Sequence, residues 1–135
     1  MDLRYLVRVL LVGLFCITLS SCQIIVPIAI QQLDDGRISI ETKNGIFRRS
    51  CIEFLTIFRV VQGKTESNFP MSWRISTMAG NDHWKRCVSK VTYPKVPADY
   101  QKDVPGEDLR PGQKYIIEAE GPGYDTKEEM VRRVF

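Results

Sequence analysis

Short stretches in which polar and apolar residues alternate recur along the chain, which is the pattern of half-buried β-strands rather than of helices. The clearest examples are residues 37–42 and 71–77, where every second side chain is apolar. The second alternation places Met71, Trp73 and Ile75 on the core face. Turn-forming residues separate these stretches, and no long segment after the N-terminal region has clean helical periodicity. We therefore expect strands over residues 37–42, 51–61, 71–77, 87–93, 115–119 and 127–135, with 94–105 as an edge strand or an ordered loop.

Residues 51–61 form the longest apolar stretch after the N-terminal region. Phe54 and Phe58 share one period-2 face, and Leu55 and Ile57 share the other. A strand that is apolar on both faces lies in the centre of its sheet or bends. A buried helix is the alternative, but the many β-branched and aromatic residues favour a strand. About seven short strands separated by turns predict an all-β antiparallel sandwich.

The N-terminal region resembles the leader of an exported lipoprotein. Arg4 and Arg8 precede an apolar run over residues 9–19, the length of a signal-peptide core. The next residues, Leu19-Ser20-Ser21-Cys22, resemble the lipobox of bacterial lipoproteins. In that family a lipid is attached to the cysteine sulfur and the leader is removed before it. The resemblance implies a signal peptide over residues 1–21, a lipid-bearing and palmitoylated Cys22, and a mature β-sandwich domain over residues 22–135.

A retained membrane anchor is the alternative for this region, because residues 9–30 are numerous enough to span a bilayer. Polar residues and Pro27 interrupt its second half, which favours the cleaved leader. Gln23 stands where related enterobacterial lipoproteins carry Asp for retention in the inner membrane. The resemblance therefore implies the periplasmic face of the outer membrane. Because residues 23–30 are mostly apolar, the first strand begins almost at the lipid or this stretch lies on the membrane surface.

The mature chain would have 114 residues, which suits one domain with a modest core. It would carry 17 basic and 15 acidic residues, close to neutrality. A general nucleic-acid-binding protein needs a strong basic surface, so we expect no nucleic-acid partner.

Two cysteines remain besides Cys22, and an even pair in an exported domain predicts a disulfide between Cys51 and Cys87. A metal site is the competing interpretation. It lacks ligands, because His83 is the only histidine and the chain has no Cys-x-x-Cys pair. We therefore expect neither a metal nor another cofactor.

Residues 109–115 read Leu-Arg-Pro-Gly-Gln-Lys-Tyr and resemble the Leu-x-Pro-Gly-x-x-Tyr corner of fibronectin type III and other immunoglobulin-like sandwiches. The resemblance implies that fold and a hydrogen bond from the tyrosine hydroxyl to nearby backbone. The residues that carry the motif are Leu109, Pro111, Gly112 and Tyr115. Together with residues 73–75 and 91–97, the corner is similar to small periplasmic lipoproteins of mostly unknown role. Some of these are thought to be immunity proteins against type VI secretion toxins.

The sequence holds little that points to catalysis. His83 has no accompanying nucleophile motif such as Gly-x-Ser-x-Gly, so we expect a protein that is not an enzyme. The turn beside it offers His83, Trp84, Lys85 and Arg86 as candidate partner-binding residues, since Trp is frequent at binding hot spots. We expect a protein that binds another envelope protein, as an accessory or structural subunit. An immunity-type inhibitor of a secreted toxin is the alternative, and a small hydrolase that uses His83 is a third hypothesis.

Overall fold

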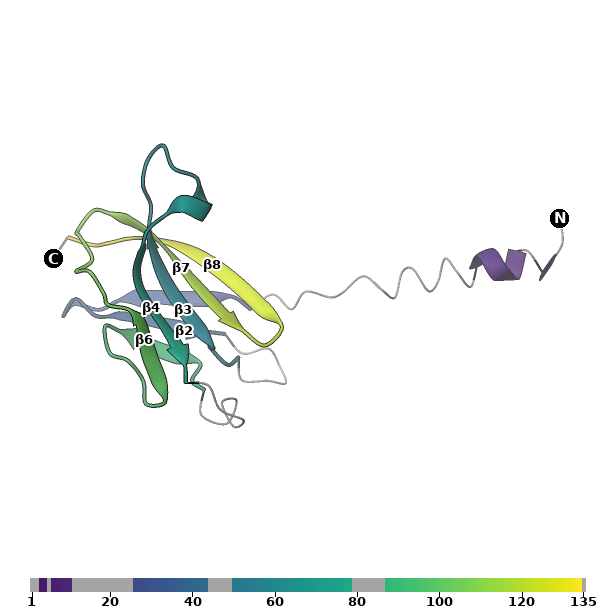
Figure 1. The fold of residues 1–135 in the computed structure, drawn as a ribbon, viewed down its shortest axis with the longest axis horizontal. Helices are drawn as coiled ribbons and strands as arrows, with labels where there is room; N and C mark the ends of the chain where they lie inside the picture. Colours follow the sequence, from purple (N-terminus) through teal and green to yellow (C-terminus); the bar gives the residue numbers. More distant parts are fainter. Residues whose placement is uncertain (1–2, 5, 11–25, 44–49, 79–86, 135) are drawn as a thin grey trace.

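The structure is a computed structural model that describes residues 3–4, 6–10, 26–43, 50–78 and 87–134. Within these residues, eight strands form two antiparallel sheets (Figure 1). The three-stranded sheet has the order β1 (Ile28–Gln32), β2 (Ile38–Thr42), β5 (Lys90–Tyr93). The five-stranded sheet has the order β6 (Tyr100–Val104), β4 (Met71–Thr77), β3 (Phe54–Arg59), β7 (Lys114–Gly121), β8 (Tyr124–Val131). A short 3-10 helix, Glu66–Asn68, lies between β3 and β4.

The strand order is that of an immunoglobulin-like sandwich. β1, β2 and β5 take the places of strands A, B and E, and β3, β7 and β8 take those of C, F and G. β4 and β6 extend the second sheet beyond β3, and β6 comes from the connection between β5 and β7. The predicted all-β, immunoglobulin-like sandwich is confirmed, with eight strands in the described residues where about seven were expected.

The core lies between the two sheets and consists of the inward side chains of both. Its largest members with at most 1% exposure are Ile38, Ile40, Ile52, Leu55, Ile57, Trp73, Ile75 and Ile117. The Trp73 and Tyr93 rings pack edge to face across the sheets, with 5.2 Å between centroids and an interplanar angle of 86°. This aromatic pair connects β4 of one sheet with β5 of the other.

β3 occupies the centre of its sheet, between β4 and β7, as its double apolar pattern predicts. Leu55 and Ile57 face the core, whereas Phe54 and Phe58 are half-buried on the outer face. The Arg74 guanidinium carbon lies 5.0 Å from the centroid of the Phe54 ring. The Arg74 guanidinium therefore covers part of this outer face.

Two details of the predicted strands are wrong. The alternation over 71–77 placed Met71 on the core face, but Met71 is 42% exposed. The pairing of β3 with β4 shifts by one residue between Ile57 and Phe58, which turns Met71 to the other side. The last strand also begins earlier and ends earlier than residues 127–135, because a tight turn pairs Gly121 with Tyr124 and β8 ends at Val131.

The fold begins close to the predicted lipid attachment site. Val26 is already buried at 5% exposure, and the Lys43 N–H donates a hydrogen bond of 2.9 Å to the Pro27 carbonyl. Of the two alternatives for residues 23–30, this favours a first strand that starts almost at Cys22, although Cys22 lies outside the described residues. No helix among the described residues is long and apolar enough to cross a bilayer.

A disulfide joins Cys51, ahead of β3, to Cys87, ahead of β5, with 5.3 Å between the Cα atoms. It therefore links the two sheets, as does a hydrogen bond from the Ile52 N–H to the Val88 carbonyl. The Tyr124 hydroxyl of β8 donates to the Cys51 carbonyl and so holds the same segment from within the five-stranded sheet. The disulfide expected from the sequence is present. These residues, with Pro27 and Lys43, define the end of the sandwich at which the chain enters, here named the entrance end.

Candidate functional site

A cavity of about 460 Å³ opens at the other end of the sandwich, here named the cavity end. Gly36, in the turn after β1, and Pro94, just after β5, lie on its wall. β1 begins at the entrance end and runs the length of its sheet to this turn. The volume falls within the range of roughly 300–1,000 Å³ that is typical of ligand pockets.

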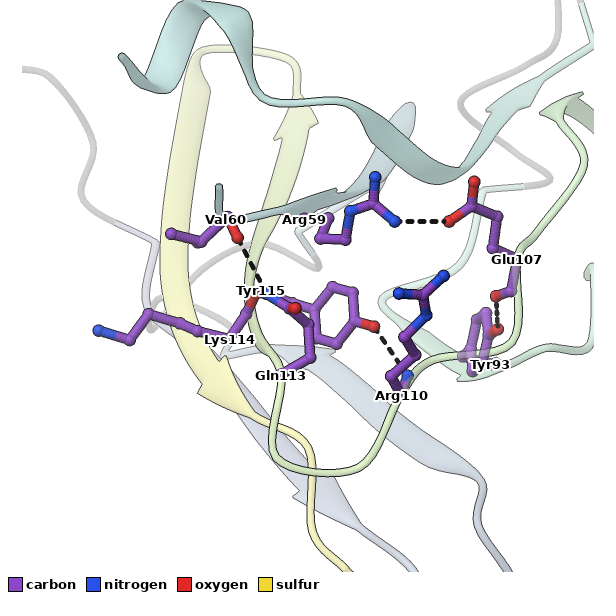
Figure 2. A network of polar contacts seen from close by, with 8 residues as sticks. All are labelled: Arg59, Val60, Tyr93, Glu107, Arg110, Gln113, Lys114 and Tyr115. Atoms are coloured by element: carbon purple, nitrogen blue, oxygen red, sulfur yellow. Dashed lines mark hydrogen bonds and ion pairs between the residues drawn. The ribbon is translucent and has the colours of Figure 1, made fainter. Parts of the chain in front are cut away.

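The floor of the cavity is aromatic and is supplied by Trp73 and Tyr93. Gly106 packs against the indole so closely that a Cβ atom there would lie 2.9 Å from Trp73 Cδ1. The Tyr93 hydroxyl donates a hydrogen bond of 3.1 Å to the Glu107 carbonyl (Figure 2). Burial, with a smaller contribution from the negative charge of Asp108, raises the pKa of Tyr93. The Tyr93 hydroxyl therefore stays protonated at physiological pH, and the floor carries no charge.

The walls of the cavity are charged. Their charged residues are Asp35, Arg37, Lys102, Asp108 and Arg132. Asp35 and Arg37 form an ion pair of 2.5 Å. A hydrogen bond from the Arg37 backbone N–H is the main cause that lowers the pKa of Asp35, so this carboxylate stays ionised.

Arg132 fastens the five-stranded sheet to the turn between β1 and β2. Its Nη2 atom donates a hydrogen bond of 2.5 Å to the Gly36 carbonyl. Beside it, the Gln32 side-chain amide donates to the Val131 carbonyl and accepts from the Arg133 N–H, both at 2.8 Å. These contacts close the β1–β8 side of the cavity end. In the sequence, Arg132 is half of the basic doublet Arg132-Arg133, and nothing local indicates its place in the cavity wall.

The Leu-x-Pro-Gly-x-x-Tyr corner supports the opposite wall. The Tyr115 hydroxyl accepts a hydrogen bond of 2.8 Å from the Arg110 N–H, and Figure 2 shows the ring pointing towards that backbone. Leu109 is buried at 7% exposure and lines the cavity, while Gly112 has φ of +77°. Pro111, the remaining motif residue, lies in the exposed turn before β7. The corner thus fixes the segment that carries Gly106 and Leu109 against the floor.

Replacing Tyr115 by phenylalanine tests this support. We expect Tyr115→Phe to lower the free energy of unfolding by about 1–3 kcal/mol, because the Arg110 N–H loses its acceptor while the ring packing is kept. Urea denaturation measures the change. A loss below about 0.5 kcal/mol, the usual range for surface substitutions, would contradict a supporting role for the hydroxyl.

The partner-binding residues predicted from the sequence, His83, Trp84, Lys85 and Arg86, lie outside the described residues, as does Cys22. Met78, the last described residue before them, has its N–H bonded to the Asp99 carbonyl, and Cys87 follows them at the entrance end. The cavity is therefore built from other residues than those the sequence singled out for binding. Of the Leu-x-Pro-Gly-x-x-Tyr residues, Leu109 lines the cavity, and the other two segments of the resemblance contribute Trp73, Tyr93 and Pro94.

A second polar group lies on the outer face of the five-stranded sheet. Oxygen atoms of Glu118, Glu120 and Asp125 lie within 4.8 Å of one another, a donor set that could hold a hard cation such as Ca²⁺. Lys127 Nζ lies 3.4 Å from Glu118 Oε2 and 2.8 Å from Glu66 Oε1. Burial, followed by the Glu120 carboxylate, raises the pKa of Glu118, and burial also raises that of Asp125.

The crowding of these carboxylates predicts that they lower the free energy of unfolding by an amount that depends on pH. Because folding raises the pKa of Glu118, protonation of this carboxyl group stabilises the folded state. The stabilisation is fully present below the unfolded pKa of about 4.5 and is lost as the pH rises through the folded pKa. We expect Glu120→Gln to raise the free energy of unfolding at pH 7 by about 0.5–1 kcal/mol, and the gain to vanish near pH 4. Glu128→Gln, which removes an exposed charge from β8 outside the group, is the matched control. Equal effects of both substitutions across this pH range would contradict the assignment.

No family model, no curated protein and no solved structure matches this chain. A function must therefore be argued from the leader motif and from the arrangement of the site. In that arrangement, an aromatic floor and charged walls meet at one end of the sandwich, and the chain enters at the other.

Proposed function

We propose that the protein is a lipid-anchored, non-enzymatic domain of the bacterial envelope, which binds another envelope protein through its cavity end as an accessory subunit. The observation that carries the proposal is the placement of the cavity. It lies at the end of the sandwich opposite the one at which the chain enters. A domain attached by its N-terminus would hold this end away from the attachment point.

The distance between anchor and domain supports this orientation. Val26 is buried in the sandwich, and only four positions separate it from Cys22. A fully extended chain of that length spans at most roughly 14 Å. A lipid on Cys22 would therefore keep the entrance end next to the bilayer. The identity of Gln23 supports the periplasmic face of the outer membrane, and a disulfide suits that oxidising compartment.

The residue types at the cavity end support a protein partner. Trp, Tyr and Arg are the side chains most enriched at the energetic centres of protein interfaces. Here Arg37 and Arg132 stand in the walls, whereas Trp73 and Tyr93 are buried at 1% and 7% exposure and support the hollow from beneath. Such a hollow suits the insertion of one side chain or a short segment from a partner surface.

Site-specific photo-cross-linking in cells tests the proposal. A photoreactive residue at Lys102, on the cavity wall, is expected to capture one discrete partner. The same residue at Lys90, exposed near the entrance end, is the control and is expected to capture none. Identical products from both positions, or none from Lys102, would contradict binding through the cavity end. A captured protein that is toxic when produced alone would instead identify an immunity role.

Attachment of a lipid at Cys22 is tested by a separate substitution. Cys22→Ser is expected to leave the precursor unprocessed and without lipid, as judged by its gel mobility and by labelling with palmitate. A variant that is still processed before residue 22, or still takes up label, would contradict attachment at Cys22.

A further inference from the structure

We propose that the groove between the edge strands β1 and β8 binds an extended segment of another protein, which pairs with the backbone of both strands and places a lysine or arginine beside Glu128. The groove has a volume of about 380 Å³. β1 forms one edge of the three-stranded sheet, and β8 forms one edge of the five-stranded sheet. None of the described residues that line the groove also lines the cavity, so this inference goes beyond binding at the cavity end.

The outer edge of β1 carries backbone groups that are not used by its own sheet. The Lys43 N–H donates a hydrogen bond of 2.9 Å to the Pro27 carbonyl, so this carbonyl faces β2. In an antiparallel pair, residues whose backbone bonds to the neighbouring strand alternate with residues whose backbone points away from it. The register of β1 and β2 is regular, so Ala29 faces β2 in the same way. The N–H and C=O groups of Ile28 and Ile30 therefore point away from β2, and both residues line the groove.

The outer edge of β8 carries the same kind of groups. The Arg132 N–H, just after this strand, donates a hydrogen bond of 2.9 Å to the Gln113 carbonyl, just before β7. Along the regular register of β7 and β8, even-numbered residues of β8 therefore face β7, and odd-numbered residues face away. The backbone groups of Lys127 and Glu129 point away from β7. Within the described residues, no backbone bond reaches them from another strand on that side.

Gln32 shows which kind of group fits between the two edges. Its side-chain amide donates to the Val131 carbonyl and accepts from the Arg133 N–H, both at 2.8 Å. An amide that projects from β1 thus takes the place of one peptide group of a neighbouring strand on β8. This contact closes the groove at the cavity end. Towards the entrance end, the peptide groups of an added segment would continue the same pairing.

The other two edge strands among the described residues are protected against an added strand. β5 has four residues and is followed by Pro94. The register of β6 against β4 shifts between Arg74 and Ile75. Short strands, proline and bulges are the features by which natural edge strands avoid pairing. β1 has five residues, none of them charged, and pairs with β2 without a register shift. An added segment is therefore expected at the β1 side of the sandwich.

Glu128 determines the charge of the segment. It lies opposite Ile117 in the register of β7 and β8, so its side chain leaves β8 on the side of the core, and it lines the groove. It is exposed and forms no ion pair with any residue that the structure describes. Glu129, in contrast, lies 3.9 Å from Lys114. An inward-pointing charge on an edge strand disfavours pairing with an apolar strand, whereas an opposite charge on the added strand stabilises the pair.

The isoleucines of β1 determine the neighbouring side chains of the segment. Ile28 and Ile30 are half-buried, so part of each side chain remains accessible in the groove. Successive side chains of an extended chain point to opposite faces, and residues two positions apart share one face. The expected ligand is therefore an extended segment with a lysine or arginine that has an apolar residue two positions away.

Peptide titration followed by nitrogen-15 NMR tests the inference on the protein purified from membranes in detergent micelles. The probe is a valine-threonine-lysine-threonine-valine peptide blocked at both termini. We expect saturable shifts and slower hydrogen exchange at four amides of the two edges, those of Ile28, Ile30, Lys127 and Glu129. The Gly106 amide at the cavity should not shift. The absence of a saturable shift at the edge amides would overturn the inference.

Two matched peptides separate backbone pairing from charge. In one, both threonines are N-methylated, which removes their N–H donors. In the other, glutamate replaces lysine. We expect each peptide to bind at least tenfold more weakly than the probe. Equal binding of the methylated peptide would show that the backbone does not pair, and equal binding of the glutamate peptide would show that Glu128 does not select the charge. Either result overturns the inference.

Charge reversal in the protein supplies the second readout. Glu128→Lys is expected to weaken binding of the lysine peptide at least tenfold and to make the glutamate peptide the better ligand. Glu41→Lys, which reverses an exposed charge on β2 outside the groove, is expected to leave both affinities unchanged. Unchanged binding in Glu128→Lys would contradict the role of this carboxylate. Shifts of the same edge amides that grow with protein concentration in the absence of peptide would identify a second copy of the chain as the occupant and overturn the inference.

Discussion

Replacing Gly121 by alanine is expected to lower the free energy of unfolding by about 3 kcal/mol or more, the upper range for overpacking. A Cβ atom at this position would overlap the Cys51 carbonyl oxygen and the Tyr124 ring. The carbonyl is part of the backbone, and its residue is held by the disulfide, so it cannot move aside as a flexible side chain would. The turn between β7 and β8 therefore requires glycine for space.

Gly123, two residues later in the same turn, is the matched control. Its φ is +77°, and a Cβ atom there would meet nothing within 4 Å. Gly123→Ala should therefore cost only the backbone strain of a left-handed residue, about 1–2 kcal/mol. Urea denaturation of both variants under non-reducing conditions gives the comparison. Equal losses would show that conformation, rather than the Cys51 contact, explains the glycine at 121.

The sequence was most informative where one local pattern decides the structure. β2 and β4 were predicted because each packs an apolar face against the core and carries polar side chains on its other face, so polar and apolar residues alternate. β3 was predicted to be central because both of its faces are covered. The Leu-x-Pro-Gly-x-x-Tyr corner was recognisable because its hydrogen bond joins residues only five positions apart.

Features that depend on distant segments could not be predicted in this way. The cavity joins the β1–β2 turn, the end of β5, the connection between β6 and β7, and Arg132 after β8. Each of these segments looks like an ordinary polar turn in the sequence, and only the topology places them together. The exposure of Met71 has the same origin, because it follows from a register shift against β3 rather than from the residues of β4.

Two tyrosines were missed for a related reason. The hydroxyls of Tyr100 and Tyr124 donate to the carbonyls of Ile52 and Cys51, so both strengthen the region of the disulfide. Burial raises the pKa of Tyr124, which keeps this donor neutral. In the sequence, both residues are simply aromatic residues next to turns, because their acceptors lie 48 and 73 positions away.

Removing the disulfide is expected to cost about 3–4 kcal/mol, since the closed loop of 36 residues restricts the unfolded chain. The Cys51→Ala/Cys87→Ala double variant should still fold, because the Ile52–Val88 hydrogen bond and the two tyrosine hydroxyls hold the same segments together. We expect a lower urea midpoint and a larger m-value, as the unfolded chain becomes less compact. Reduction of the unchanged protein should give the same midpoint. Loss of the native near-ultraviolet circular dichroism would contradict this explanation.

The disulfide and Gly121 are also expected to be coupled. The rigidity that makes alanine at 121 so costly comes in part from the bond that fixes Cys51. Without the disulfide, the Cys51 carbonyl can shift to make room for a Cβ atom. Gly121→Ala should therefore lower the free energy of unfolding by about 0.5–3 kcal/mol less in the double-alanine background, which is the usual coupling energy between contacting residues. A Cβ atom at Gly123 would contact nothing within 4 Å, so Gly123→Ala should lower the free energy of unfolding equally in both backgrounds. An unchanged cost of Gly121→Ala would mean that β3 and β7, rather than the disulfide, hold the carbonyl in place.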